Sequence, residues 1–150
     1  MTIYREKLWP APWLFISTAL VIPASLLVFL PINIFVGVGS AIALYLLCLA
    51  GLLLSATKIE VTQSELIAGK ARLPIEIIGS VDGFRGAEAT LERGQRLDAR
   101  SFLVIRGWVD PVVRIELVDP NDPVPYWLVS TRNPEKVSQA IDQARTNSTA

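Results

Sequence analysis

The sequence predicts an α+β membrane protein: an N-terminal hairpin of two transmembrane helices, then a small antiparallel β-meander domain closed by a C-terminal helix. Three observations predict this class. No charged residue occurs from Leu8 to Thr57. Apolar residues then recur with the period of two that is typical of strands, and near the end with a helical period. We therefore divide the chain into a hairpin (1–57), a β-rich domain (58–145) and a frayed tail (146–150).

The apolar region is long enough for two bilayer crossings. The segment from Trp13 to Leu30 is about 27 Å long as a helix, which matches the hydrocarbon layer. Pro23 is expected to kink this span, and Pro31 and Asn33 end it. Residues 34–57 supply the second span. Small residues near its start allow the two helices to approach closely; they are Gly37, Gly39, Ala41 and Ala43.

A cleaved signal peptide is the alternative interpretation, because Arg5 and Lys7 precede an apolar core. The apolar run is about twice as long as a signal peptide uses, and cleavage would leave a second full span behind. We therefore favour an uncleaved hairpin. The turn at Pro31 has no basic residue, whereas both flanks do, so both termini are expected in the cytoplasm. The predicted interface anchors are Trp9, Trp13 and Lys58.

The region after Lys58 alternates apolar and polar residues in short runs joined by turns. Ile59 and Val61 begin this pattern, and further strands are expected near 102–108, 112–119 and 126–131. Links of turn length favour an antiparallel meander. The segment from Gly86 to Arg100 is polar, and we expect either a short helix or a long ordered loop there.

The C-terminal segment carries the signals of a helix that begins at a defined position. Asn133 is a good N-cap, and Pro134 suits the first helical position. Apolar residues then follow at i, i+3, i+4 and i+7; they are Val137, Ala140, Ile141 and Ala144. This stripe is expected to lie across the sheet and close its core.

The composition argues against several kinds of chemistry. The chain has no histidine and one cysteine, Cys48, which argues against a disulfide, a zinc site or a Cys–His nucleophile. The formal net charge is zero and does not point to nucleic acid. Asp110, Asp119 and Asp122 lack the spacing of a calcium loop and are interpreted as turn residues. We therefore expect no metal and no cofactor.

Several segments together resemble a known family. They are "YREKLW", "LDARSFLVIRGWV" and "VRIELVDPNDPVPYWLVSTRNPEKV", accompanied by the two apolar spans. The chain resembles an uncharacterised family of small actinobacterial membrane proteins, known only as a domain of unknown function. The resemblance implies a bacterial plasma-membrane location and no particular activity. The meander ending in "STRNPEKV" with its closing helix is also similar to bacterial pleckstrin-homology-like (PH-like) domains, which often hang from short membrane helices.

Late aromatic and arginine residues form the candidate binding face. They are Arg106, Trp108, Arg114, Tyr126, Trp127 and Arg132. On one face they would suit a partner peptide or an anionic headgroup; the alternative is ordinary packing, with the arginines paired to Glu116, Asp119 or Asp122. Trp127 and Tyr126 should point to opposite sides, so at most one of them is expected at the surface.

A second basic stretch lies inside the polar segment. Arg85, Arg93, Arg96 and Arg100 alternate with Glu88, Glu92 and Asp98. We interpret this stretch as a solvated face, with phospholipid headgroups as the alternative contact.

These observations favour a non-enzymatic binding module held at the cytoplasmic membrane face. Its expected partner is a membrane or membrane-associated protein, or further copies of itself in a homo-oligomer. A second hypothesis is recognition of anionic lipid headgroups through the arginine and aromatic face. A third is an enzyme at the membrane surface that uses only carboxylates, which would need two acidic groups in one concave pocket.

Overall fold

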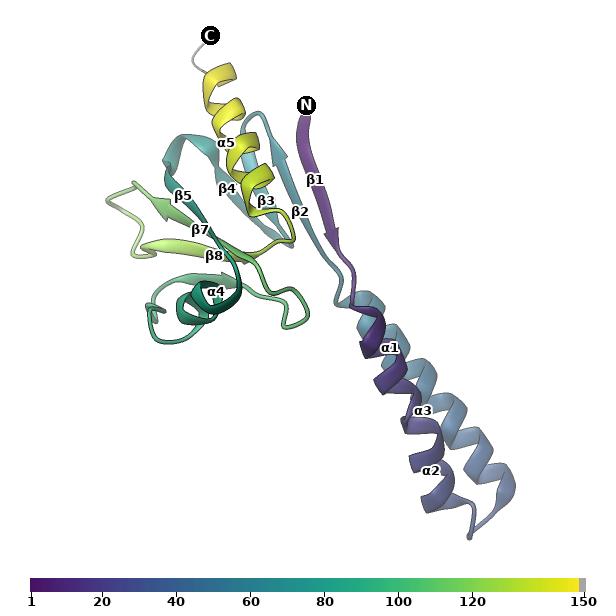
Figure 1. Cartoon of the computed structure of the whole chain (residues 1–150). Helices are drawn as coiled ribbons and strands as arrows, with labels where there is room; N and C mark the ends of the chain where they lie inside the picture. The colour runs from purple at the N-terminus through teal and green to yellow at the C-terminus, as the bar shows by residue number, and fades with distance from the viewer. Residues whose placement is uncertain (149–150) are drawn as a thin grey trace. The chain divides into compact units, whose positions relative to one another are not determined.

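The computed structural model describes residues 1–148, which form two compact units. The hairpin unit consists of Trp9–Ala56. The β unit combines Met1–Leu8 with the chain from Thr57 onward, so the hairpin is inserted within the sequence of the β unit (Figure 1).

The hairpin unit contains three helical segments: α1 (Pro12–Ala19), α2 (Val21–Phe29) and α3 (Ile34–Leu54). The first two form one apolar span that is interrupted at Leu20. Pro23 explains the position of this break, because it has no N–H to donate to the carbonyl four residues earlier, in the last turn of α1. Both spans are long and apolar enough to cross a membrane.

The small residues of α3 divide into two groups. Gly37 and Ala41 are buried against the rest of the hairpin, and a Cβ atom on Gly37 would lie 3.2 Å from the backbone nitrogen of Leu30. Gly39 has open space around it, and Ala43 is exposed. Only the first pair therefore supports close helix approach.

Sheet A is an antiparallel meander of four strands in the order β1-β2-β3-β4. The strands are β1 (Thr2–Leu8), β2 (Thr57–Thr62), β3 (Glu65–Ala68) and β4 (Ala71–Pro74). Strand β1 pairs with β2, so that Leu8 lies opposite Thr57. The first eight residues, which were predicted to be part of the hairpin, therefore belong to the β unit. Strand β1 could not be predicted from the sequence, because it is short and charged and its partner β2 follows two apolar spans. No turn next to β1 indicates this pairing.

Sheet B has four strands in the order β5-β7-β8-β6. They are β5 (Ile78–Phe84), β6 (Phe102–Val104), β7 (Val112–Leu117) and β8 (Tyr126–Ser130), and a 3-10 turn (Ile75–Ile77) precedes β5. Strands β5, β7 and β8 are antiparallel, but β6 runs parallel to β8. The predicted meander is therefore wrong at β6. Helix α4 (Gly86–Arg93) and the loop after it carry the chain past β7 and β8, so that β6 joins the far edge.

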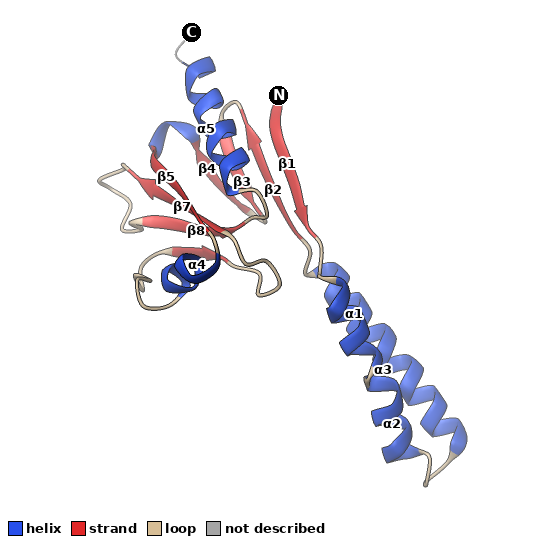
Figure 2. Cartoon of the chain, in the orientation of Figure 1, coloured by secondary structure: helices blue, strands red, loops and turns tan. Residues whose placement is uncertain are grey.

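Helix α5 (Pro134–Ser148) begins where the sequence predicts and contacts strands of both sheets (Figure 2). The N–H groups of Lys136 and Val137 donate to the carbonyl of Asn133. The predicted apolar stripe is buried in the core. Of the predicted frayed tail, residues 146–148 are helical, and residues 149 and 150 lie outside the described residues.

The β unit has two apolar clusters, one on each face of sheet B. The larger lies between the two sheets and α5 and includes Trp127 and Val129. The smaller lies on the side of α4 and includes Ala89, Tyr126 and Leu128. The predicted alternation along β8 is thus confirmed, and all five residues of β8 are buried because both faces are covered.

Candidate functional site

The structure does not bring the six predicted binding residues onto one surface. Tyr126 and Trp127 are both buried, on opposite faces of β8. Trp108 is half-buried against the larger cluster, and its buried Nε1 has no hydrogen-bond partner within residues 1–148. The three aromatic rings therefore contribute mainly to packing.

Two of the predicted arginines lie at strand ends. The backbone N–H of Arg106 donates to Ser130 Oγ (2.9 Å), and its guanidinium donates to the carbonyl of Ile105 (2.9 Å). The backbone N–H of Arg132 donates to Glu6 Oε1 (3.0 Å), and Thr131 Oγ1 donates to the other oxygen of the same carboxylate (2.5 Å). Glu6 of β1 thereby fastens the first strand to the segment after β8.

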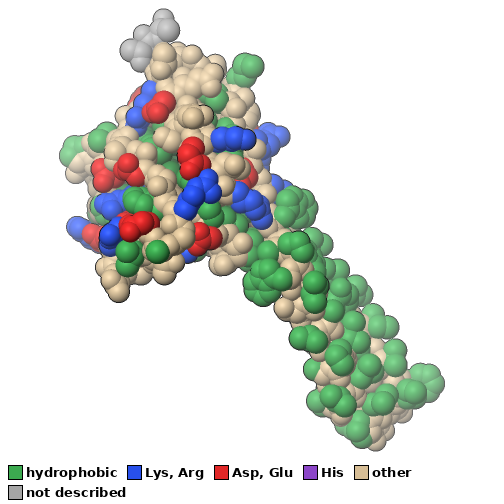
Figure 3. All heavy atoms as spheres, viewed as in Figure 1, with side chains coloured by type: hydrophobic (Ala, Val, Ile, Leu, Met, Phe, Trp, Pro, Cys, Tyr) green, Lys and Arg blue, Asp and Glu red, His purple; other side chains and the backbone are tan. Residues whose placement is uncertain are grey.

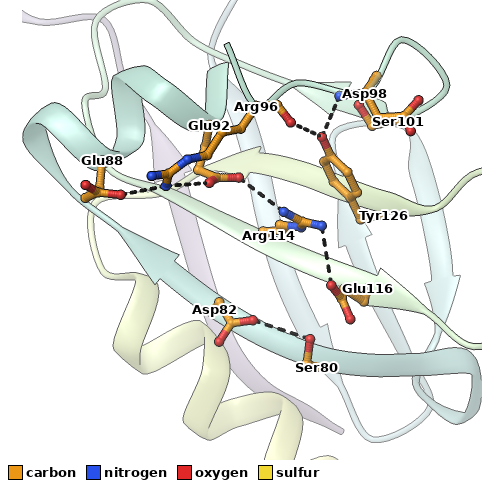
Figure 4. Close-up of polar contacts among 10 residues, drawn as sticks. All are labelled: Ser80, Asp82, Glu88, Glu92, Arg96, Asp98, Ser101, Arg114, Glu116 and Tyr126. Carbon is orange, nitrogen blue, oxygen red and sulfur yellow. Dashed lines mark hydrogen bonds and ion pairs between the residues drawn. The ribbon is translucent and has the colours of Figure 1, made fainter. Parts of the chain in front are cut away.

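Arg114 and Tyr126 meet in a polar cluster on the side of sheet B that α4 covers (Figure 4). The guanidinium carbon of Arg114 lies 4.1 Å from the centre of the Tyr126 ring, a cation–π contact. The Tyr126 hydroxyl accepts a hydrogen bond from the backbone N–H of Asp98 (2.8 Å) and donates to the carbonyl of Arg96 (3.4 Å). The loop after α4 is thus bound to β8.

Glu92 is the buried centre of this cluster, with only 2% of the residue exposed. Its carboxylate contacts Arg114 (3.4 Å) and Arg96 (3.3 Å), and Arg96 also pairs with Glu88 (2.7 Å). The predicted solvated face is wrong at Glu92, because Glu92 and Ala89 face the sheet and are buried. A buried carboxylate needs such partners, so the arrangement fixes α4 to β7.

The other arginines of this stretch pair at the surface. The pairs are Arg85–Glu135 (2.6 Å), Arg93–Asp110 (3.2 Å) and Arg100–Asp98 (3.0 Å). The backbone N–H of Gly86, 2.7 Å from the Asp110 carboxylate, holds the pKa of that carboxyl below its usual value, and Arg93 adds to this effect.

The turn function expected of the aspartates near β7 and β8 is confirmed for two of them. Asp119 and Asp122 each accept a backbone N–H two residues later. Within residues 1–148, no group of three or more His, Cys, Asp or Glu side chains could hold a metal ion.

On the outer face of sheet A, strands β1 and β2 carry three cations, two of which contact the carboxylate of Glu60. Lys7 lies directly opposite Lys58, and Arg5 lies opposite Glu60. Glu60 accepts hydrogen bonds from Lys58, from Thr2 Oγ1 (2.6 Å) and from Arg5 (3.0 Å). These bonds, that of Lys58 first, lower the pKa of Glu60 to about 2. The excess of basic over acidic groups leaves this face positively charged.

A groove of about 380 Å³ lies between the β3–β4 turn and strand β6. Its lining residues come from distant parts of the β unit: Thr57, Ala68, Gly69, Lys70, Ala71, Phe102, Leu103, Val104 and Arg106. The lining contains two cations and no carboxylate. Phe102 and Leu103 are 38% and 43% exposed, unusual values for large apolar side chains of the β unit. The groove could not be predicted from the sequence, because only the pairing of β6 with β8 brings its walls together.

A family model described as "Protein of unknown function (DUF3093)" matches residues 3–141. The chain belongs to this family. The match runs from β1 through the hairpin to α5, so the strands and the inserted helices are parts of one family domain. Membership of a family of unknown function is thereby confirmed. No curated protein and no solved structure matches the chain.

Proposed function

We propose that this chain is a two-span protein of the bacterial plasma membrane, whose β unit is a non-enzymatic binding module at the cytoplasmic face. The pairing of β1 with β2 carries the proposal. These strands flank the inserted hairpin in sequence and lie side by side in one sheet. Both ends of the hairpin therefore start from the same folded unit, which favours an even number of membrane crossings.

The surface of the hairpin unit supports its insertion into lipid. Large apolar side chains cover it (Figure 3), and Leu27 and Phe35 are 79% and 84% exposed. The apolar helix of a soluble core would instead be mostly buried. Trp9 and Trp13, the proposed interface anchors, are both exposed in this unit.

The position of β1 argues against cleavage of the first span as a signal peptide. Leu8 is fully buried in the core of the β unit, and Glu6 binds Thr131 and Arg132. Cleavage after the first span would remove this strand and expose the edge of β2. We therefore propose that the mature protein keeps both spans.

Basic residues near both hairpin ends support a cytoplasmic location of the β unit. Arg5, Lys7 and Lys58 lie on β1 and β2, and the hairpin turn at residues 30–33 carries no charge. Two sheets with a C-terminal helix that contacts strands of both also support the proposed likeness to PH-like domains. We further propose an actinobacterial origin, on the basis of the family resemblance in the sequence.

A module held at the membrane surface would meet its partners in the plane of the membrane. We propose that the β unit binds a membrane-associated protein or a second copy of the chain. The exposed Arg132 is a suitable probe of this contact, because its side chain reaches the carbonyl of Lys7, near the start of the hairpin.

The attachment test uses the full chain, since a fragment starting at Lys58 would lack β1. We expect the protein to stay in the membrane after carbonate washing. In a Cys48→Ser background, Ile32→Cys at the hairpin turn should react with an impermeant maleimide in intact cells. Gln143→Cys on α5 should react only after permeabilisation. Release by carbonate, or labelling of position 143 in intact cells, would overturn the proposed attachment.

The partner test places a photoreactive residue at Arg132 in the same membranes. The matched control position is Gln143, which is also exposed. We expect a discrete crosslinked species from position 132 and none from position 143. Only diffuse lipid adducts at position 132 would contradict protein binding there.

A further inference from the structure

We propose that the groove between the β3–β4 turn and β6 binds the headgroup of an acidic phospholipid of the membrane that holds the hairpin. This inference rests on the proposed membrane attachment. It differs from the headgroup hypothesis based on the arginine and aromatic face, because only Arg106 of those six residues lines the groove, beside Lys70, Phe102 and Leu103.

A short covalent link joins the groove to the end of the second span. Thr57 lines the groove and follows Leu54, the last residue of α3, by three residues. Three residues of extended chain reach about 10 Å. Leu8 lies opposite Thr57, and the N–H of Gly69 donates to the carbonyl of Lys58 (2.8 Å). Both chain junctions and the β3–β4 turn therefore lie at the same end of sheet A.

The charged groups at this end select an anion. Lys70 is exposed on the tight turn, and its ammonium has no hydrogen bond or ion pair within the described part of the chain. Lys7 and Lys58 lie directly opposite each other, and Lys58 forms an ion pair with Glu60. Basic residues close to a bilayer are also attracted to acidic lipids.

The apolar groups beside these cations match the interfacial region of a bilayer. Phe102 and Leu103 lie on the three-residue edge strand β6, and the Phe102 ring is fixed against Trp127 at a centroid distance of 4.5 Å. Aromatic and aliphatic side chains next to lysines suit the boundary between headgroups and acyl chains. A peptide would also fit an apolar groove, but connectivity to the spans favours lipid.

The test uses the full chain in nanodiscs, with a fluorophore at Leu103→Cys in the Cys48→Ser background. Brominated lipids report its proximity to the bilayer. We expect quenching in discs with acidic lipid, little quenching in zwitterionic discs, and weakening by salt. A fluorophore at Val118→Cys, exposed and outside the groove, should not be quenched. Lys70→Gln should raise the acidic-lipid fraction needed for half-maximal quenching about fivefold.

Lys136→Gln is the matched control, since Lys136 is exposed on α5 and does not line the groove. It should leave the lipid dependence unchanged. Equal quenching in acidic and zwitterionic discs would overturn the inference, and so would equal effects of the two lysine variants. A fluorescence change at position 103 that requires an added protein partner would also overturn it. Carbonate extraction distinguishes a failure of lipid binding from a failure of membrane attachment. If the protein stays in the membrane after carbonate washing, only the lipid-binding inference is overturned; if carbonate releases it, the proposed attachment is overturned.

Discussion

The two sheets of the β unit have the same number of strands but differ in how their faces are covered. Sheet A contributes one face to the core, through residues such as Leu8, Ile59 and Val61, and presents charged side chains on the other. Sheet B packs on the core with one face and is covered by α4 on the other. Sheet A therefore has a surface available for binding, whereas the corresponding surface of sheet B is used for packing.

This difference shows why a binding face cannot be assigned from strand chemistry alone. Arg114 and Tyr126 have the residue types of a recognition surface, but they lie beneath α4, where Glu92 neutralises the arginine. Lys7 and Lys58 lie opposite each other on two adjacent strands of sheet A and remain exposed. The covering element thus decides the function of a strand face.

The largest expected effect tests whether β1 belongs to the core of sheet A. Leu8 is fully buried, so Leu8→Ala should lower the free energy of unfolding by about 2–5 kcal/mol, from lost burial and the cavity that remains. Denaturant unfolding of the full chain in nanodiscs, followed by near-ultraviolet circular dichroism, measures the change.

The control is Val118→Ala, because Val118 is exposed and the substitution should change stability by no more than about 0.5 kcal/mol. If the two variants are equally stable, β1 is not part of the core, and sheet A has only three structural strands.

A second, smaller effect tests the covered face of sheet B. Glu88 and Glu92 both contact Arg96, but only Glu92 is buried. Glu92→Ala should destabilise the β unit by about 1–3 kcal/mol, because it leaves the half-buried Arg114 without this carboxylate. Glu88→Ala should cost about 0.5 kcal/mol or less, as is usual for an exposed pair.

Hydrogen exchange of the α4 amides provides an independent measurement for this pair of variants. It should accelerate in Glu92→Ala and stay near the wild-type rate in Glu88→Ala. Equal exchange in both variants would mean that the inner face of α4 is solvated, so that sheet B has an open face as sheet A does.

Much of the fold could be predicted from local patterns. The apolar spans, the alternation of Lys58, Ile59 and Val61, and the start of α5 at Pro134 all depend on residues close in sequence. Period and capping rules apply directly to such segments.

The remaining features depend on pairing between distant segments. Strand β1 has its partner on the other side of the hairpin, and β6 joins β8 in parallel after α4 has crossed the sheet. The sequence predicted the alternation of Tyr126 and Trp127 but not the second cover that buries both. Glu92 has the same chemistry as its exposed neighbours, so only the packing of α4 distinguishes it.

The smallest expected effect concerns the charged outer face of sheet A, where Glu60 lies buried beneath its partners, and is a dependence on pH. The pKa of Glu60 is lowered from 4.5 to about 2 by Lys58, Thr2 and Arg5. Because the folded value lies below the unfolded one, the ionised carboxylate stabilises the fold fully above about pH 4.5. This contribution is lost as the pH falls towards 2.

Glu60→Gln isolates this contribution because it keeps the shape of the side chain but does not titrate. The wild type should lose stability relative to this variant between pH 4.5 and 2. Lys58→Met should narrow this pH range, because it removes the largest cause of the lowered Glu60 pKa. Unfolding midpoints across the pH range, with exchange rates of the β1 and β2 amides, measure both effects. If the stability of the wild type and of Glu60→Gln depends on pH in the same way, the cations do not hold the Glu60 carboxylate in its ionised form. The charged outer face, by which sheet A differs from sheet B, would then lack this fixed arrangement of ion pairs.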